Sequence, residues 1–457
     1  MTEKMTEKIS DKSDNKNTTI RVLAIARLCN PDWVSVPLVG WNHYNSIQSR
    51  FDTHLITHIE NKNNILNAGI PADKVTFLGS MRVIRTLRQI ARLISHRAQH
   101  VTENALEIPL YLYLELKIWR LFRHRIKAKE FQIVHRITPL SPVIPSLLAR
   151  LCHKNGIPFV LGPLNGGLPW PPGSEDIRQK EAEWVSSLRP LKRFLPFYRS
   201  TRTHSKAIIL ASAMAWREMD ADCRQHCFYM PENAIDENRF STHRMAPHIG
   251  PLKCVFVGRL VAVKGIEIAI HALLPFLKNG QIVFEIIGDG PIKNTLTDLV
   301  KNLDVQNVVH FLGWIDNSKV AEQLALSQIF LFPSIREFGG AVVLEAMMIG
   351  LVPVICDYGG PAEFVDESHG FLIPVGKREK IISALSAVLQ KLVEMTPQSI
   401  FELGQKSRKK TLANFTMNSK LNRTAEIYDW CVSGDADKKP KFLPPEASLQ
   451  RYIDMGF

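Results

Sequence analysis

Glu337 and Glu345 flank a glycine pair, Gly339-Gly340, and an apolar run that closes at Gly350. A run that is apolar almost all round is typical of a buried helix, and a carboxylate on it needs a hydrogen-bond partner because an unpaired buried charge is costly. The glycine loop before the helix offers backbone N–H groups and the positive end of the helix dipole, which suit a phosphate or a sugar hydroxyl. We therefore expect a ligand site here, and a ribose diol would suit Glu345.

The flanking residues predict the elements that hold this stretch in place. Residues 329–332 have the composition of a short buried strand, Pro333-Ser334 ends the strand, and residues 341–349 form a helix. The plain alternative is that Glu337 is a solvated loop carboxylate and that Glu345 is tied to a neighbouring backbone amide.

A second group of residues suits a diphosphate. The predicted strand 254–257 runs into Gly258-Arg259-Leu260, and Lys264-Gly265 follows just before a predicted helix. A diphosphate needs backbone N–H donors together with a guanidinium and an ammonium group to balance its charge. We expect Arg259 and Lys264 to supply those cations, the alternative being that both are ordinary surface charges.

Together these segments resemble a known family. The Gly-Arg-Leu…Lys-Gly pattern at 258–265, the Gly-Asp-Gly-Pro element at 288–291 and the glutamate pair are similar to the motifs of retaining glycosyltransferases of family four, also called glycosyl transferases group 1. The resemblance is close over residues 254–374 and loose before them. It implies the α/β fold called GT-B, in which two Rossmann-like domains with parallel sheets face a central cleft.

The resemblance also implies roles for single residues. Glu337 would lie against the donor sugar, Glu345 would hold the nucleotide ribose, and Arg259 with Lys264 would bind the diphosphate. The remaining residues implied for the donor pocket are Gly258, Gly288, Trp314, Ile315, Phe338, Gly339, Gly340 and Ala341.

The first half of the chain offers fewer candidates for the acceptor side. His135 ends a predicted strand, 131–135, and open α/β sheets place ligands at the carboxyl ends of their strands. Many members of the family have a histidine near the end of the strand that falls at 157–161 here, whereas this chain has Gly162. His135 is therefore our acceptor-side candidate, with a structural histidine as the alternative, and the Gly- and Pro-rich loop 162–173 is a candidate acceptor wall.

The domain organisation follows from the same pattern. We expect a disordered tail at 1–18, an acceptor-side Rossmann-like domain at 19–236, a linker at 237–251, a nucleotide-sugar-binding domain at 252–420, a helix crossing back onto the first domain at 421–432, and a C-terminal extension without an assigned role at 433–457.

The composition is that of a soluble globular protein with room for two domains, since 45% of its 457 residues are hydrophobic and 22% are charged. No apolar run predicts a transmembrane helix, and residues 1–18 lack the apolar core of a secretory signal. Seven scattered cysteines show neither a disulfide framework nor zinc-site spacing, which fits a reducing cytoplasm. We expect no metal and no cofactor.

The net positive charge of the chain comes entirely from its first half. Residues 1–250 hold 35 Lys and Arg against 22 Asp and Glu, whereas residues 251–457 hold 22 of each. Within 80–130, Arg82, Arg85, Arg88 and Arg92 recur at helical spacing opposite apolar residues, a pattern suited to an anionic membrane surface. The alternatives are a solvated basic face and a nucleic-acid patch, and no aromatic interleaving supports the latter, so we expect no nucleic-acid partner.

These observations predict a retaining, metal-independent glycosyltransferase that moves a sugar from a nucleotide diphosphate sugar to a glycan or lipid-linked acceptor. We expect it in the cytoplasm, at the inner face of the membrane, in cell-surface polysaccharide synthesis. Two alternatives remain open. One is a sugar-nucleotide epimerase or phosphorolytic enzyme on the same fold, and the other is a non-catalytic subunit that binds a nucleotide sugar.

Overall fold

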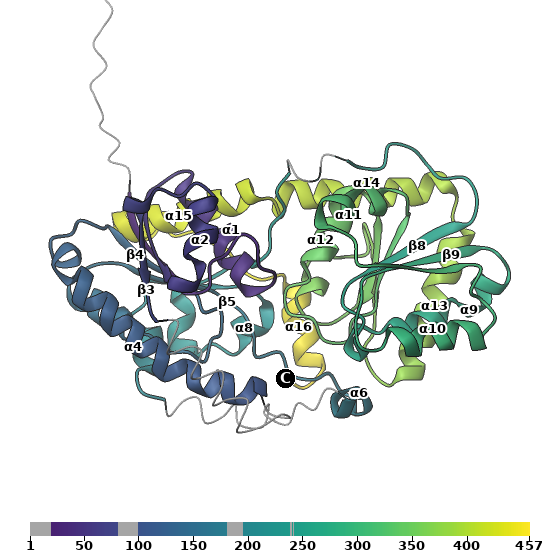
Figure 1. Cartoon of the computed structure of the whole chain (residues 1–457), viewed down its shortest axis with the longest axis horizontal. Coiled ribbons are helices and arrows are strands. Elements are labelled where there is room, and N and C mark those ends of the chain that lie inside the picture. The colour runs from purple at the N-terminus through teal and green to yellow at the C-terminus, as the bar shows by residue number, and fades with distance from the viewer. Residues whose placement is uncertain (1–19, 81–98, 181–194, 238–239, 241) are drawn as a thin grey trace, which may run out of the picture.

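The computed structural model describes residues 20–80, 99–180, 195–237, 240 and 242–457, and it shows two parallel sheets, each flanked by helices (Figure 1). The first sheet has the strand order β3-β2-β1-β4-β5-β6-β7 and the second β10-β9-β8-β11-β12-β13. The strands of the first sheet are β1 (Arg21–Ala26), β2 (Asp52–His58), β3 (Val75–Leu78), β4 (Ile133–Thr138), β5 (Phe159–Leu164), β6 (Ala207–Leu210) and β7 (Cys227–Tyr229). Those of the second are β8 (Leu252–Val257), β9 (Ile282–Ile287), β10 (Val309–Gly313), β11 (Ile329–Phe332), β12 (Val352–Cys356) and β13 (Phe371–Ile373).

The helices alternate with the strands. In the first domain they are α1 (Val36–Gln48), α2 (Lys62–Asn67), α4 (Gln99–Lys127), α5 (Leu147–Lys154), α6 (Glu175–Lys180), α7 (Tyr198–Thr203) and α8 (Ala213–Arg217). In the second they are α9 (Ile266–Lys278), α10 (Lys293–Asn302), α11 (Asn317–Ala325), α12 (Ala341–Ile349), α13 (Arg378–Glu394) and α14 (Pro397–Asn414), followed by α15 (Met417–Ser433) and α16 (Glu446–Asp454). None of the described helices is long and apolar enough to cross a bilayer.

Strand β1 shows why the first sheet carries helices on both faces. Every residue of β1 except Arg21 is buried, as expected for a parallel strand covered on two sides. Leu23 and Ile25 belong to a core cluster with α4 and α5, and Val22 and Ala24 belong to another with α1 and α15. The alternation of side chains along the strand thus divides the core into two layers.

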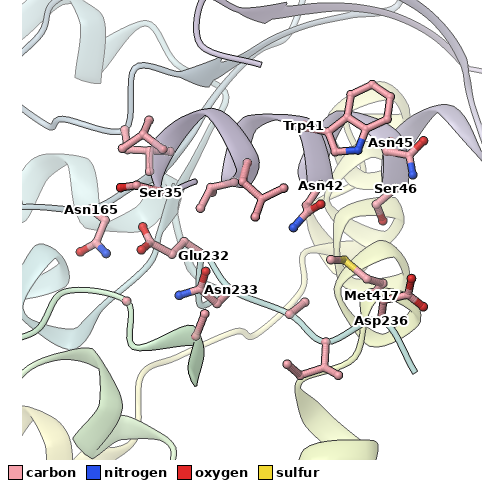
Figure 2. A pocket seen from close by; sticks show the side chains of 18 of the residues that line it. Ser35, Trp41, Asn42, Asn45, Ser46, Asn165, Glu232, Asn233, Asp236 and Met417 are labelled. Atoms are coloured by element: carbon pink, nitrogen blue, oxygen red, sulfur yellow. The ribbon is translucent and has the colours of Figure 1, made fainter. Parts of the chain in front are cut away.

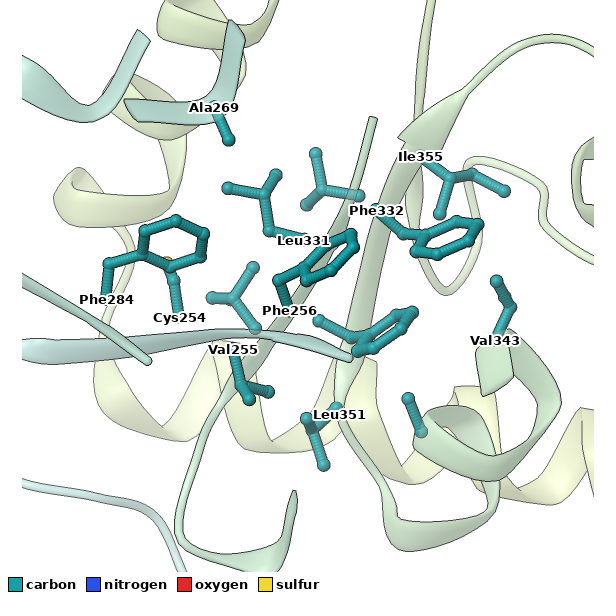
Figure 3. Packing of buried hydrophobic residues seen from close by; sticks show 14 of the residues in the cluster. Cys254, Val255, Phe256, Ala269, Phe284, Leu331, Phe332, Val343, Leu351 and Ile355 are labelled. Carbon is teal, nitrogen blue, oxygen red and sulfur yellow. The ribbon is translucent and has the colours of Figure 1, made fainter. Parts of the chain in front are cut away.

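The core of the second domain is built around aromatic side chains (Figure 3). The rings of Phe256 and Phe332 stack with centroids 5.8 Å apart, and those of Phe330 and Phe332 lie 5.7 Å apart. Because Phe256 is on β8 and Phe332 is the last residue of β11, this stack fixes where the two strands end relative to one another.

The strand order reverses once in each sheet, and these reversals place the site. Strands β1 and β4 are neighbours in the first sheet, as β8 and β11 are in the second, and the chain turns away in opposite directions from each pair. In open α/β sheets the crevice at such a reversal is where ligands bind, beyond the carboxyl ends of the strands. The loops after β8 and β11 carry the two predicted ligand motifs, so both belong to this crevice.

The chain crosses between the domains more than once. Helix α15 packs on the first sheet through Tyr428 and Trp430, and its N-terminus is tied to the interdomain segment by the Met417 N–H donating to the Ile235 carbonyl oxygen at 2.9 Å. Beyond α15 the chain runs along β7, where the Tyr229 N–H donates to the Phe442 carbonyl oxygen at 2.8 Å. Helix α16 then lies between the two lobes (Figure 1).

The structure confirms most of the expected elements and adds several. Strand 329–332 and helix 341–349 have the predicted bounds. Strand β3 and helix α16, which the sequence did not predict, are short, and α16 lies in the extension that received no assignment. The expected tail at 1–18 and Arg82, Arg85, Arg88 and Arg92 lie outside the described residues.

Candidate functional site

A cavity of about 1130 Å³ lies between the two domains. Its walls come from α1, from the ends of β4 and β5, from the segment after β7, from the loop after β11, and from the starts of α12 and α15. Sites for small ligands commonly measure roughly 300–1000 Å³, so this cavity has room for more than one small molecule.

Six of the predicted donor residues line this cavity from the second domain, namely Glu337, Phe338, Gly339, Gly340, Ala341 and Glu345. Helix α12 begins directly at the cavity, with Gly340 as its N-cap residue. Because Gly340 has no side chain to cap the helix, the first turn presents backbone N–H groups and the positive end of the dipole there. The arrangement is suited to an anionic group.

An ion pair between Lys264 and Glu337 joins the two predicted motifs. The two side chains are 20% and 19% exposed, and the Lys264 Nζ lies 5.0 Å from the ring centroid of Phe332. The backbones meet as well, since the Ile335 N–H donates to the Val263 carbonyl oxygen at 2.9 Å. The loops after β8 and β11 therefore form one unit, in which the ammonium of Lys264, which does not itself line the cavity, is held against the carboxylate of Glu337, which does.

Other predicted donor residues lie at the same edge of the sheet but do not line the cavity. The Gly258 N–H donates to the Ile287 carbonyl oxygen at 3.0 Å, and the Gly288 N–H donates to the Gly313 carbonyl oxygen at 2.8 Å. Arg259 is exposed beside them. These contacts hold the ends of β8, β9 and β10 together.

The loop after β10 also stays outside the cavity lining. Trp314 is 70% exposed, while Ile315 packs against the core of the second domain. The roles implied for both residues beside a nucleotide base therefore remain predictions.

His135 is placed differently from the expectation. It is fully buried, its Nδ1 lies 2.6 Å from the Tyr428 hydroxyl, and its Nε2 lies 2.7 Å from the Gly162 carbonyl oxygen. Burial lowers the pKa of His135 to about 4. With both ring nitrogens engaged and none of its atoms lining the cavity, His135 has the contacts of a structural residue that links β4 to α15, so the structure corrects its placement on the acceptor side.

The predicted acceptor wall lies against both domains. Asn165 and Gly166 line the cavity. Further along the loop, the Arg336 guanidinium donates to the Leu168 carbonyl oxygen at 2.9 Å, and the Tyr358 hydroxyl donates to the Pro169 carbonyl oxygen at 2.8 Å. The loop thus forms part of the interdomain contact beside the glutamate motif.

Several lining residues were not predicted from the sequence. Figure 2 shows Glu232, Asn233 and Asn165 gathered at one part of the cavity, and Trp41 and Asn42 on α1 at another. Glu232 and Asn233 come shortly after a strand, following Pro231, and this position at the carboxyl end of a strand could have identified them as candidate ligand-binding residues. Trp41 and Asn42 lie in a segment, 31–45, that the sequence suggested as a loop with its contact to donor or acceptor left open, and the structure shows that most of this segment belongs to α1.

A buried carboxyl group also joins the domains close to the cavity. The Ala213 N–H donates to Oε1 of Glu363 at 2.9 Å, and the Tyr229 hydroxyl donates to Oε2 at 2.9 Å. Both donors belong to the first domain, whereas Glu363 follows β12 of the second. Burial raises the pKa of Glu363 from its usual 4.5 to about 7.

Replacing Glu363 by glutamine should flatten the pH dependence of stability. A raised pKa means that the folded protein holds a proton that the unfolded chain releases, so this contribution is complete below about pH 4.5 and is lost as the pH rises through about 7. A pKa shift of this size corresponds to at most about 3 kcal/mol in the free energy of unfolding. Between pH 5.5 and 8 the melting temperature of the wild type should fall by a few degrees more than that of Glu363→Gln. The control is Glu267→Gln, which changes an exposed glutamate and should behave as the wild type. An equal fall in the wild type and in Glu363→Gln would contradict the raised pKa of Glu363.

Comparison with known proteins shows which proteins the second domain is similar to. Residues 246–399 match the protein-family model described as Glycosyl transferases group 1. WcaL of Escherichia coli (strain K12), named as a colanic acid biosynthesis glycosyltransferase, is 25% identical over 215 residues, which are 45% of this chain and 53% of WcaL. The amylovoran biosynthesis glycosyltransferase AmsK of Erwinia amylovora is 25% identical over 187 residues, 39% of this chain and 45% of AmsK. The chain thus spans about half the length of the relatives it matches.

Solved structures resemble the chain over nearly its whole length. A glycosyltransferase from Rickettsia africae ESF-5 has a TM-score of 0.59 at 15% identity, over 92% of this chain and 100% of that one. Anabaena Alr3699/HepE, solved in complex with UDP and glucose, has a TM-score of 0.55 at 16% identity, over 90% of this chain and 99% of that one. Such likenesses confirm the predicted fold of two Rossmann-like domains. In sequence the second domain is therefore similar to glycosyl transferases group 1, and in fold the whole chain is similar to solved glycosyltransferases of the GT-B type.

Proposed function

We propose that this protein is a retaining, metal-independent glycosyltransferase that moves a sugar from a nucleotide diphosphate sugar to a glycan or lipid-linked acceptor. The observation that carries the proposal is the convergence of the Lys264–Glu337 ion pair, the α12 N-terminus and Glu345 on one interdomain cavity. The names of WcaL and AmsK support a place in cell-surface polysaccharide synthesis.

In this proposal the donor binds along the second domain. The diphosphate lies at the α12 N-terminus, where backbone N–H groups and the helix dipole favour an anion. Glu345, one turn further along α12 and still at the cavity, accepts hydrogen bonds from the ribose hydroxyls. A nucleotide diphosphate sugar carries both the negative charge and the diol that these groups require.

The transfer itself exchanges one bond for another. The bond between the anomeric carbon and the diphosphate oxygen breaks, and its electron pair leaves with the diphosphate. The acceptor oxygen bonds to the same carbon from the same face, and its proton passes to the departing diphosphate. Lys264 and Arg259 stabilise the added negative charge, and Glu337 orients the sugar and stabilises the positive charge that develops on its ring.

Thermal unfolding across a panel of ligands tests the donor site. The panel contains ADP, UDP, GDP and dTDP with a hexose conjugate of each, and it is applied to the wild type, Arg259→Ala and Glu345→Ala. A ligand at 100 times its Kd adds about 2.7 kcal/mol of stability. We expect one base to raise the melting temperature of the wild type and to do so far less in both variants, with Lys278→Ala, at the other end of α9, behaving as wild type.

The result that would overturn the proposal is a wild type that no nucleotide stabilises. If donor binding is found, NMR of the glycan product should show the anomeric configuration of the donor. Release of a free or epimerised sugar without any acceptor would instead favour the epimerase alternative.

We further propose that α4 contacts an anionic membrane surface on the cytoplasmic side. Among the described residues of α4, three large apolar side chains are exposed to solvent: Tyr113 is 52% exposed, Leu116 is 41% exposed and Leu121 is 58% exposed. Arg120 and Arg123 are exposed on the same helix. Apolar and basic residues alternating on one helix face are suited to lying in the interface of an anionic bilayer.

Charge reversal on α4 should weaken flotation with liposomes that contain anionic lipid. The double variant Arg120→Glu, Arg123→Glu loses two attractive contacts, each worth about 1 kcal/mol near such a surface. The control, Lys406→Glu with Lys409→Glu on α14, makes the same charge change at the same spacing on exposed positions of the second domain. Equal loss in the two variants would show that net charge alone is responsible, and no binding by the wild type at low salt would exclude the membrane contact.

A further inference from the structure

Glu232 contributes a carboxyl group to the cavity from the opposite domain to Glu337 and Glu345. It follows Pro231 in the segment after β7 that leads toward the second domain, and it lines the cavity together with Asn233. The side chain of Asn165 hydrogen-bonds to it. Its Oε2 is buried, and no hydrogen-bond donor among the described residues reaches that atom.

The side chain presses against the glycine loop of the proposed donor site. A Cβ atom built on Gly339 would lie 2.1 Å from Oε1 of Glu232 and 2.5 Å from Nδ2 of Asn233, distances that real Cβ atoms essentially never show. Side chains of the first domain therefore lie within contact distance of the Gly339 backbone. Glu232 is in this way held beside the residues that begin α12.

The backbone of Glu232 is fixed as well. The ammonium of Lys420, a buried residue on α15, donates to the Glu232 carbonyl oxygen. Burial lowers the pKa of Lys420 to about 8. The carboxyl group is thus presented from a segment that is anchored on one side by α15 and on the other by Asn165, so its position does not depend on a flexible loop.

The charges around Glu232 limit what it can bind. Burial and the nearby negative charge of Glu337 raise the pKa of Glu232. The hydroxyl groups of a sugar ring are uncharged and can donate to the carboxyl groups of both Glu232 and Glu337. A buried carboxylate oxygen without a donor is costly, and a sugar hydroxyl removes that cost.

We propose that Glu232 hydrogen-bonds hydroxyl groups of the transferred sugar, on the side of the ring opposite Glu337, and so determines which sugar is accepted. This inference rests on the proposed function and goes beyond it, because it assigns sugar selection to a residue of the first domain. A sugar lacking a hydroxyl in the right orientation would leave Oε2 without a donor, and sites built for hydrogen bonding reject such ligands strongly.

Calorimetric titrations can isolate this contact. The probes are UDP with UDP-glucose and UDP-galactose, and GDP with GDP-mannose, applied to the wild type, Glu232→Gln and Glu232→Ala. The decisive quantity is the ratio of the affinities for the nucleotide sugar and the matching nucleotide. We expect Glu232→Gln and Glu232→Ala to bind the nucleotide within about twofold of the wild type and to lose about tenfold or more of the affinity for the preferred sugar conjugate, the size expected for one hydrogen bond to a charged group.

The control is Asp236→Asn, which removes a carboxylate of the same segment that also lines the cavity but is exposed to solvent. It should leave the ratio unchanged. Glu232 would be a structural residue only, and the inference wrong, if its variants lost nucleotide and nucleotide-sugar binding in equal proportion or if the ratio did not move. A wild type that binds neither these five probes nor ADP, dTDP and their hexose conjugates would overturn the donor site itself, an outcome distinct from an intact nucleotide site with an unchanged ratio.

Discussion

Removing the charge of Lys264 is expected to lower kcat/KM for sugar transfer by about one to two orders of magnitude. A hydrogen bond to a charged group is worth roughly 1.5–3 kcal/mol, and each 1.36 kcal/mol is tenfold in rate. The loss should fall at the upper end, because Glu337 then has no ammonium partner and the diphosphate keeps only one of its two proposed cations, Arg259. Methionine is the replacement of choice, since it keeps a flexible apolar side chain over the ring of Phe332.

Steady-state kinetics with the donor identified by thermal unfolding provide the measurement. Lys278→Met is the matched control, because Lys278 is an exposed lysine at the far end of the neighbouring helix. A decrease of less than threefold in Lys264→Met would show that the ion pair has no part in the transition state. A decrease shared by the control would point to altered solubility or folding.

Gly265→Ala should cost far more stability than Gly280→Ala, although the two positions have nearly the same backbone conformation. Their φ angles are +70° and +68°, so both alanines carry the same conformational strain, about 1–2 kcal/mol. At Gly280 nothing lies within 4 Å of the added Cβ, whereas at Gly265 the Cβ would meet the Pro333 carbonyl oxygen at 2.2 Å. The difference between the two variants therefore measures the close approach of the two loops.

We expect the melting temperature of Gly265→Ala to lie several degrees below that of Gly280→Ala. Because the loop after β8 must move away from the start of the glutamate motif, Gly265→Ala should also weaken nucleotide binding, while Gly280→Ala should not. Thermal unfolding with and without the stabilising nucleotide measures both effects. Equal melting temperatures would show that the two loops can separate at no cost. The conclusion that the loops after β8 and β11 form one unit would then be wrong.

The local elements around the site could be predicted because each has its own signal. The strand at 329–332 is a short apolar run stopped by Pro333, and the helix at 341–349 is bounded by Gly340 and Gly350. Such boundaries depend on neighbouring residues only, so they can be recognised without knowing what packs against them.

Contacts between distant segments could not be predicted in the same way. His135 was expected to end a strand, as a ligand-binding residue would, but β4 continues to Thr138, and Tyr428 and the Gly162 carbonyl oxygen occupy the ring nitrogens of His135. Glu232 gave only a weak signal, and its importance follows from Gly339, which is more than one hundred residues away in the sequence. Helix α16 was not recognised from its sequence, and it is held by the packing of its Tyr452 against Tyr358.

The sequence by itself determined the parallel α/β architecture, the two motifs of the second domain and the class of ligand that they suit, because apolar periodicity, glycine positions and charge are local properties of the chain. Only the tertiary structure decided that Lys264 pairs with Glu337, that His135 is buried away from the cavity and that Glu232 faces the glycine loop. The physical reason is that these contacts form only when the two sheets and α15 pack together. They depend on the order of the strands and on how the two domains lie against each other, and they do not depend on the neighbours of a residue in the chain.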